Sequence, residues 1–444
     1  MARPLDDITR VNLAADGTIN AFFGDASFAE DGSNGRVMVR IPRCYVKATN
    51  PSASVYKWFL SDQPLSGYEL HPAFYQRGGT AKKFIYIASY EADLVPDAGG
   101  SHTLHSRSGK QPMTGGVIYE VPFDAGNNEP DVDDVLDSDN GDDGWTLVGY
   151  EVTSGAWGDN DAAGKLWIRK VGDDDPGWSD DDTITNSTQG DETVCTQNGA
   201  DSAIDFDIDD AEDFANNIGS GWGVTNIWTR QLVLLLMMMD WGDLDSQSTV
   251  GRGIVDKASG TGFAGELTAS NSINSNLDSD GTISSSYGGY AGEANDGTYP
   301  IAWRYIENFW GNVWEFVIGI NALDAEYRVL PKAGLAAATC DGTLGAGDYT
   351  ASTCTPLTDD DGYIDDIEWE TLLEYLFIPS SSGGGAATYI PDYFYSHDSG
   401  ETNVWLAGGF WLQGSWAGAG SSAEHQAASI SSRFIGSRLE YLPQ

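Results

Sequence analysis

The charge balance of this chain limits the conditions under which it folds more than any other feature of the sequence. Its 444 residues include 67 acidic and 23 basic side chains, which gives a formal net charge of −44. At ordinary ionic strength such a surface repels itself and destabilises the compact state. At molar salt the Debye length falls to about 3 Å, so this repulsion is screened. The composition therefore predicts a protein adapted to a hypersaline medium, with a mildly acidic tail protein of a marine host as the alternative. It also disfavours a nucleic-acid partner, because few side chains are available to neutralise phosphates.

Three kinds of segment follow one another along the chain. Residues 1–35 predict a short N-terminal attachment segment without a core of its own. Residues 36–115 and 213–444 carry alternating strand patterns such as RVMVRIPRCYVK and FIYI, one dense apolar helix at about 225–241, and a second expected helix in IEWETLLEYLF. Between them, residues 116–212 hold short alternating runs separated by acidic loops, which predicts a small acidic all-β insertion.

The sequence carries no visible export or membrane signal. The stretch MARPLDDITRVNLAADG lacks an apolar core of signal-peptide length. The longest apolar run, residues 232–239, is far shorter than the roughly 20 residues that span a bilayer, so we expect no membrane insertion. Cys340 and Cys354 bracket a stretch rich in Gly, Thr and Ala and suit a disulfide across a surface loop, although their spacing alone leaves free thiols equally open.

Four sequence blocks occur in a recognisable order. They are HPAFYQRGGTAKKFIYIASYEA, GSGWGVTNIWTRQLVLLLMMMDWGDLDSQ, RYIENFWGNVWEFVIGIN, and GGFWLQGSWAGAG followed by SSRFIGSRLEY. WGNVWEF is the most specific of these motifs. In these blocks the chain resembles phage tail proteins and targets of diversity-generating retroelements, including the major tropism determinant class, which share the formylglycine-generating-enzyme-like C-type lectin fold. The resemblance implies an α+β, C-type-lectin-like domain interrupted by the all-β insertion.

In that family the C-terminal segment forms surface loops held by framework residues at each end. The resemblance implies framework roles for Gly408, Gly409, Gly436, Ser437 and Arg438. The implied receptor-binding face consists of Trp411, Gln413, Ser415, Trp416, Glu424, His425 and Gln426. Aromatic rings flanked by hydrogen-bonding groups suit sugars or protein patches. We expect Trp411 and Trp416 at the surface and Phe410 in the core, and the alternative that both tryptophans belong to the core stays open.

Catalysis is not expected. The formylglycine-generating enzymes of this fold depend on redox-active cysteines near the C-terminus, and no cysteine follows Cys354 here. The five histidines are scattered, and no GxSxG motif is present. The sequence therefore predicts no catalytic residues and a protein that is not an enzyme.

Two segments offer oxygen ligands that would suit calcium. From the family's NxxGNxWE pattern, the resemblance implies a site at Asn308, Gly311, Val313 and Glu315, residues that equally suit turn caps. Separately, LTDDDGYIDDIE at 357–368 matches much of an EF-hand loop through Asp359, Asp361, Asp365 and Glu368. Its first position is a leucine where an aspartate is expected, so a solvated acidic turn is the alternative.

These observations lead to an expected function in adhesion. We expect a receptor-binding protein of the tail fibre or tail tip of an archaeal virus, located on the virion and therefore extracellular. Its expected partners are a host cell-surface glycan or surface-layer protein, other virion tail proteins, and further copies of itself, with a trimer implied by the family. The alternatives are a structural virion protein, such as a baseplate or capsid decoration, and a cellular surface-display protein.

Overall fold

The protein is mainly a β structure. The computed structural model describes residues 5, 7–75, 80–97, 99–116, 118–170, 176–199, 202–257, 296–323, 326–330, 350–370, 373–388, 390–396 and 402–443. It has 38% strand and 10% helix, with a closed six-stranded barrel and a half-barrel. The expected α+β, C-type-lectin-like fold is therefore wrong. One segment carries a long apolar helical run, whereas segments such as RVMVRIP at 36–42 follow the period of a strand.

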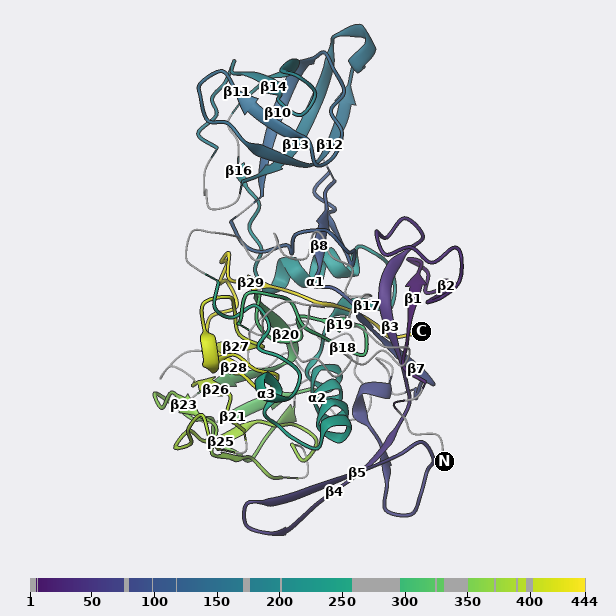
Figure 1. Cartoon of the computed structure of the whole chain (residues 1–444), viewed down its shortest axis with the longest axis vertical. Helices are drawn as coiled ribbons and strands as arrows, with labels where there is room; N and C mark the ends of the chain where they lie inside the picture. The colour runs from purple at the N-terminus through teal and green to yellow at the C-terminus, as the bar shows by residue number, and fades with distance from the viewer. Residues whose placement is uncertain are drawn as a thin grey trace.

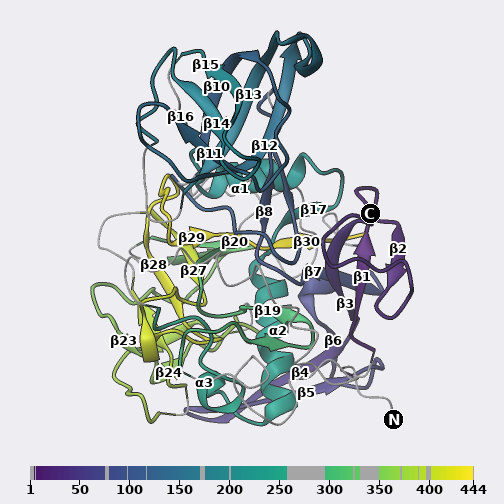
Figure 2. The ribbon, with the colours of Figure 1, turned by 45° about the horizontal axis from the view of Figure 1, so that its top comes forward.

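The helix predicted at about 225–241 is confirmed. The described helices are α1 (Ile208–Asn216), α2 (Ile227–Trp241), α3 (Ser246–Thr249), and the short 3-10 turns η1 (Pro72–Phe74), η2 (Trp157–Asp159) and η5 (Gly414–Trp416). The Asn226 side chain caps the start of α2 by accepting a hydrogen bond from the backbone N–H of Thr229, and Gly242 ends the helix with φ +72°. Every residue from Ile227 to Met237 is buried, and Figure 2 shows α2 running through the middle of the body.

The second predicted helix, IEWETLLEYLF, is wrong. Ile367 belongs to a strand, and the described residues 373–375 form a turn. Trp58 from a distant hairpin donates a hydrogen bond to the carbonyl of Glu374 and packs against Phe377 at 4.9 Å between ring centroids. These tertiary contacts hold the described part of the segment in a non-helical path despite its helix-forming residues.

A six-stranded sheet crosses one side of the body in the order β17-β30-β7-β3-β1-β2. Its strands are β1 (Thr9–Leu13), β2 (Ile19–Phe22), β3 (Arg36–Pro42), β7 (Phe84–Ala88), β17 (Trp222–Val224) and β30 (Leu439–Tyr441). All five neighbouring pairs are antiparallel. Val11 and Leu13, from the segment expected to attach the chain elsewhere, are fully buried in the main core.

A second unit, set off at one end of the molecule in Figure 1, forms the closed barrel. Its strands are β10 (Tyr119–Gly126), β11 (Val135–Ser138), β12 (Trp145–Ser154), β13 (Ala162–Arg169), β14 (Thr183–Asn186) and β15 (Glu192–Gln197), with β16 (Ser202–Ala203) attached to β10. The barrel closes because β10 pairs with both β13 and β15. Trp145, Leu166 and their neighbours fill its interior as a core separate from that of the body. Tyr119 pairs with Ala203, so the chain enters and leaves the barrel side by side.

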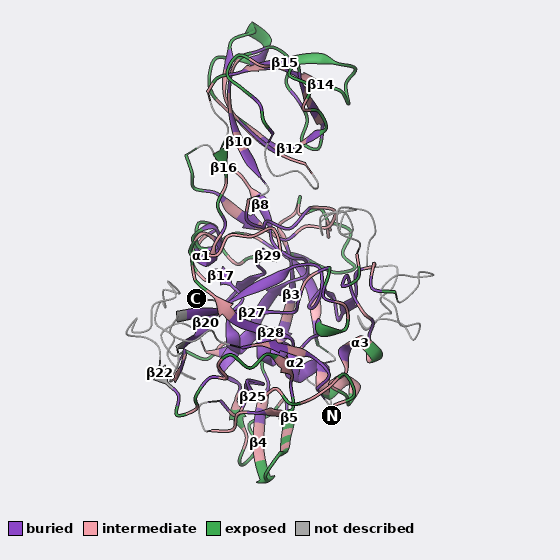
Figure 3. Ribbon diagram, turned by 90° about the vertical axis from the view of Figure 1, so that its left-hand side faces the viewer, coloured by how far each residue is buried: buried purple, intermediate pink, exposed green. Residues whose placement is uncertain are grey.

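The third large sheet carries the C-terminal loops. Its strands are β20 (Trp314–Leu323), β21 (Glu326–Val329), β22 (Thr350–Ala351), β23 (Gly362–Tyr363), β26 (Tyr393–Tyr395), β27 (Thr402–Ala407), β28 (Ser422–Gln426) and β29 (Ile435–Gly436). The order is β22-β21-β20-β27-β28-β26-β23, with β29 beside β20. Figure 3 shows β20, β27 and β28 largely buried. The loop 408–421 therefore projects from a rigid pair of central strands, β27 and β28.

Short strand pairs complete the body. A three-stranded sheet contains β4 (Tyr45–Ser52), β5 (Val55–Ser61) and β6 (Glu69–Leu70), and two-stranded pairs join β8 (Asp93–Val95) to β9 (Thr103–His105), β18 (Ala302–Trp303) to β19 (Ile306–Glu307), and β24 (Asp366–Ile367) to β25 (Pro379–Ser381). In Figure 1 the β4–β5 hairpin projects from the end of the molecule opposite the barrel.

Candidate functional site

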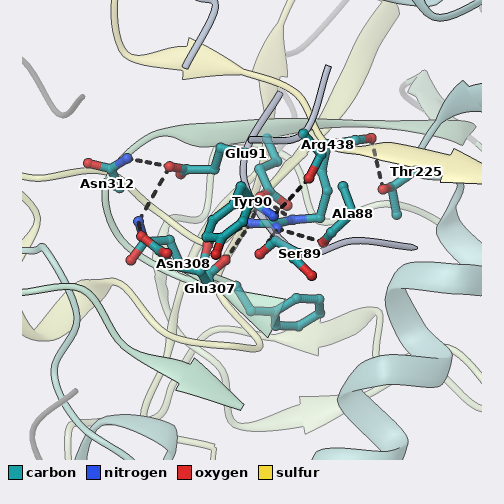
Figure 4. Close-up of polar contacts among 12 residues, drawn as sticks. Ala88, Ser89, Tyr90, Glu91, Thr225, Glu307, Asn308, Asn312 and Arg438 are labelled. Atoms are coloured by element: carbon teal, nitrogen blue, oxygen red, sulfur yellow. Dashed lines mark hydrogen bonds and ion pairs between the residues drawn. The ribbon is translucent and has the colours of Figure 1, made fainter. Parts of the chain in front are cut away.

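A buried ionic network anchors the C-terminal loops to the body. The carboxylate of Glu315 on β20 accepts hydrogen bonds from Arg230 on α2 at 2.5 Å and from Nε of Arg438 at 2.7 Å. Arg438 also donates to the carbonyls of Ala88 at 3.1 Å and Glu307 at 2.7 Å (Figure 4). Because one guanidinium contacts Ala88 as well as Glu307 and Glu315, it ties the end of the chain to two segments distant in sequence and fixes where the chain emerges from the loops.

The first predicted calcium site lies in this network, and its acidic ligand is already engaged. Both carboxylate oxygens of Glu315 accept from arginines. Asn308 points its side-chain amide toward Glu91 at 3.4 Å, and the neighbouring Asn312 donates to the same carboxylate (Figure 4). Gly311, with φ +76°, and buried Val313 complete the tight turn. We therefore interpret these residues as a turn held by hydrogen bonds.

The buried carboxyl groups of this network are not fully neutralised by its arginines. Burial raises the pKa of Glu91 to about 8, and the charge of Arg438 only partly opposes that effect. The pKa of Glu307 is also raised, first by burial and then by the nearby Glu91 carboxyl. A neutral, protonated carboxyl in this region relieves the repulsion among neighbouring acids.

The structure does not bring the second set of predicted calcium ligands together. Asp361 accepts hydrogen bonds from the N–H and hydroxyl of Ser396, and Asp359 is exposed with φ +53°. Asp365 lies at the start of the β24–β25 pairing, where its N–H bonds to a carbonyl of β25. Glu368 turns toward the Cys354 thiol. These residues lie before, between and after the short strands β23 and β24 and do not form one coordinating loop. The predicted partner of Cys354, Cys340, lies outside the described residues.

The seven predicted receptor-binding residues divide between core and surface. Trp411 is only 5% exposed and packs against Phe434 with 5.1 Å between ring centroids, so its expected display is wrong. Glu424 is also buried, beside Tyr327, and this burial raises its pKa. By contrast, Trp416 is 44% exposed and Ser415 is exposed with its hydroxyl 3.2 Å from that of Tyr363.

The remaining three predicted residues meet in one pocket. Gln413, His425 and Gln426 line a surface hollow of about 270 Å³. Its other lining residues are Trp314, Tyr395, Leu406, Phe410, Ile430, Ser432, Phe434 and Ile435. The pocket residues come from β20, β26, β27, β28, β29, the loop 408–421 and the loop before β29, so the large C-terminal sheet brings them together.

The polar groups of the pocket are held in fixed positions. The side-chain oxygen of Gln413 accepts from the backbone N–H of Phe410 at 3.1 Å, and its amide donates to the hydroxyl of Tyr395 at 3.2 Å. Burial raises the pKa of Tyr395 to about 12, so this phenol stays neutral over the physiological range. The His425 ring lies 5.4 Å from the Tyr395 ring.

Outside the pocket, tyrosines and a tryptophan form a continuous aromatic ridge. We define this ridge as Tyr363, Tyr393, Tyr395 and Trp416. Trp416 stacks on Tyr393 with centroids 4.9 Å apart and planes inclined by 25°. Tyr393 also contacts Tyr395 at 4.9 Å and Tyr363 at 5.4 Å. Since Tyr395 also lines the pocket, the ridge and pocket form one surface.

This surface differs in charge from the molecule around it. None of the eleven described residues that line the pocket is acidic, although 67 of the 444 residues of the chain are. A pocket with aromatic walls and a few oriented amide, imidazole and hydroxyl groups suits an uncharged, hydroxylated ligand with an apolar face. The sequence predicted Gln413, Trp416, His425 and Gln426 but missed Tyr393 and Tyr395, for which the repeat YFY was the available signal.

Comparison with known proteins does not assign a function to this site. No protein-family model matches the chain, and no curated protein matches it. Within the described ranges, no group of three or more His, Cys, Asp or Glu side chains is arranged to hold a metal ion. None of the helices in that part of the chain has the length and apolarity needed to cross a membrane.

Proposed function

We propose that this chain is a viral receptor-binding protein that recognises a glycan on its host's surface through the pocket and the aromatic ridge. The observation that carries the proposal is the acid-free aromatic pocket among the C-terminal loops of a strongly acidic protein. The viral assignment rests on the four sequence blocks, since the lectin-like fold that they implied is not the one observed.

The shape of the surface supports a sugar as ligand. The faces of pyranose rings carry C–H groups that pack on aromatic rings, while their hydroxyls need fixed donors and acceptors. The ridge offers the rings, and Gln413, His425 and Gln426 offer polar groups within the adjoining pocket. Each site contributes modest affinity, and several copies on a virion multiply it.

The test is binding of glycans released from candidate host envelopes, measured in high salt by isothermal calorimetry. We compare the wild-type chain with Trp416→Ala and Tyr393→Ala. The matched control is Phe22→Ala, which removes a ring of similar exposure (38% against 44%) from β2.

The proposal predicts saturable binding that both ridge variants lose and the control retains. Glycan binding that is unchanged in both ridge variants would place recognition elsewhere on the chain. If neither glycans nor intact host cells bind the wild-type protein, the alternative of a structural virion protein is favoured.

A further inference from the structure

The β4–β5 hairpin interrupts the acidic character of the chain. No aspartate or glutamate occurs between Asp31 and Asp62, while five basic residues do: Arg36, Arg40, Arg43, Lys47 and Lys57. This is a large share of the 23 basic residues in a protein with 67 acidic ones. Two of these residues, Lys47 and Lys57, lie on the hairpin, while Arg36 and Arg40 lie on β3 in the six-stranded sheet.

One face of the hairpin fixes it to the body. Tyr56 stacks on Trp369 with centroids 5.2 Å apart, and its hydroxyl bonds to Asp366 at 2.5 Å. Trp58 packs against Phe377 and donates to the Glu374 carbonyl at 2.9 Å. These contacts lie along much of β5, so the hairpin is a rigid part of the fold.

The other face of the hairpin is largely open within the described chain, although Lys47 lies beside Gly67 of the following loop. Lys47 lies opposite Phe59, and Lys57 opposite Thr49, so their side chains share one face. Phe59 is 43% exposed, and Val55 on the same face is also exposed. Figure 3 shows the tip of the hairpin as exposed.

The lysines on this face also lack acidic neighbours. In the described part of the chain, Lys110, Lys165 and Lys170 each pair with a carboxylate, and no such pair forms at Lys47 or Lys57. A lysine on an edge strand protects it against unwanted strand pairing. That role does not explain an exposed phenylalanine and valine beside it, since apolar groups on an edge favour association.

We propose that this face, comprising Lys47, Val55, Lys57 and Phe59, docks on the acidic barrel of a second copy of the same chain. The barrel supplies the complementary charge, with Asp139, Asp143, Asp180 and Asp181 exposed on neighbouring loops. Asn140 links these loops by donating to Asp182 at 2.9 Å and to the Gly177 carbonyl at 3.0 Å.

The arrangement of charge determines the symmetry of this contact. A two-fold contact between two hairpins would bring the lysines of both copies together and is disfavoured. Contact between a hairpin and a barrel pairs opposite charges, and these two surfaces lie at opposite ends of the molecule (Figure 1). Such a head-to-tail contact joins copies into rings or open chains.

The experiment measures the mass of the full-length protein in solution by sedimentation velocity over a range of concentrations. The salt concentration is the lowest at which its CD spectrum stays native, because electrostatic pairing is strongest there. The variants are Lys47→Glu/Lys57→Glu on the hairpin, Asp143→Lys/Asp180→Lys on the barrel, and all four changes combined. Lys82→Glu/Lys83→Glu is the control, since it changes the net charge by the same amount as the hairpin variant and lies outside both the hairpin and the barrel.

The inference predicts that wild type and control associate as concentration rises, that each charge reversal abolishes association, and that the combined variant restores it. Phe59→Ala weakens association by about tenfold or more, because a buried aromatic ring contributes at least 1.4 kcal/mol. A wild-type protein that stays monomeric, or a hairpin variant that associates normally, would overturn the inference. Failure of the combined variant to restore association would overturn the barrel as the docking surface. Glycan binding is measured separately, so this result does not depend on the proposed function.

Discussion

Arg438 and Glu315 form a fully buried ion pair between residues 123 positions apart, with Nε 2.7 Å from Oε1. Arg438 follows the C-terminal loops in sequence, and Glu315 begins the central strand of the sheet that supports them. The pair therefore positions the loops from beneath while lying outside the pocket itself.

Replacing Arg438 by methionine is expected to destabilise the protein by about 3–5 kcal/mol, because Glu315 keeps its buried charge with only one remaining arginine partner. The urea midpoint of unfolding, followed by tryptophan fluorescence, measures this loss. The control is Arg328→Met, which breaks the partly exposed pair with Glu326 and should cost less than about 1 kcal/mol. Equal losses in the two variants would show that the buried pair has no special role.

Adjacent residues in the C-terminal loop should respond differently to truncation. Trp411→Ala removes a buried ring that packs against Phe410 and Phe434, and we expect a loss of about 3–5 kcal/mol in stability. Leu412→Ala removes a side chain that is 44% exposed and should change stability by less than about 0.5 kcal/mol. Thermal unfolding of the two variants in the same salt compares them directly. A Trp411→Ala protein as stable as the wild type would indicate that this tryptophan is displayed at the surface.

Asp392 makes the stability of the pocket region depend on pH. Burial raises its pKa from 3.8 to about 8, although the N–H of Gly420 partly opposes the shift. Between these two values the folded state holds a proton that the unfolded state has lost, so stability falls as pH rises, by up to about 1.4 kcal/mol per pH unit. The contribution is complete below the lower value, and the fall ends above the higher one.

Asp392→Asn removes this titration while keeping an oxygen that can accept from Gly420. Chemical unfolding at intervals from pH 5 to pH 8 should therefore show a shallower slope in the variant. Some slope will remain because the pKa of Glu91 is also raised to about 8. Parallel curves for the variant and the wild type would exclude Asp392 as a source of the pH dependence.

The net charge of −44 predicts a requirement for salt. Transfer from molar salt to about 0.1 M lengthens the Debye length from about 3 Å to about 10 Å, and the exposed carboxylates then repel one another over longer distances. We expect the near-UV CD signal of the folded protein to be lost on this transfer. A signal that persists unchanged would contradict adaptation to hypersaline conditions.

Local patterns in the sequence predicted several elements well. The helix α2 was visible because it contains the longest apolar run of the chain, residues 232–239, and β3 and β7 were visible as alternating or apolar runs. The fold class was not predictable in this way. The resemblance implied an α+β architecture, whereas the structure is mostly β. The described residues of the segment 367–377 are not helical, because contacts with Trp58 outweigh their helix propensity.

The site was only partly predictable for a similar reason. Gln413, His425 and Gln426 lie in or beside one loop, so the sequence grouped them. Tyr395 joins them only because β26 pairs in parallel with β28, a long-range relationship that leaves no local pattern. Nor does spacing distinguish Trp411, which turns inward onto Phe434, from Trp416, which stacks outward on Tyr393.

The strand β30 has a consequence for biosynthesis. It pairs with both β7 and β17 inside the six-stranded sheet, and it comprises residues 439–441. During translation β7 is therefore synthesised long before β30, and until then the hydrogen-bonding groups on that edge of β7 are unpaired. A truncated product that lacks β30 keeps this edge open, which exposes it to aggregation and to cellular quality control.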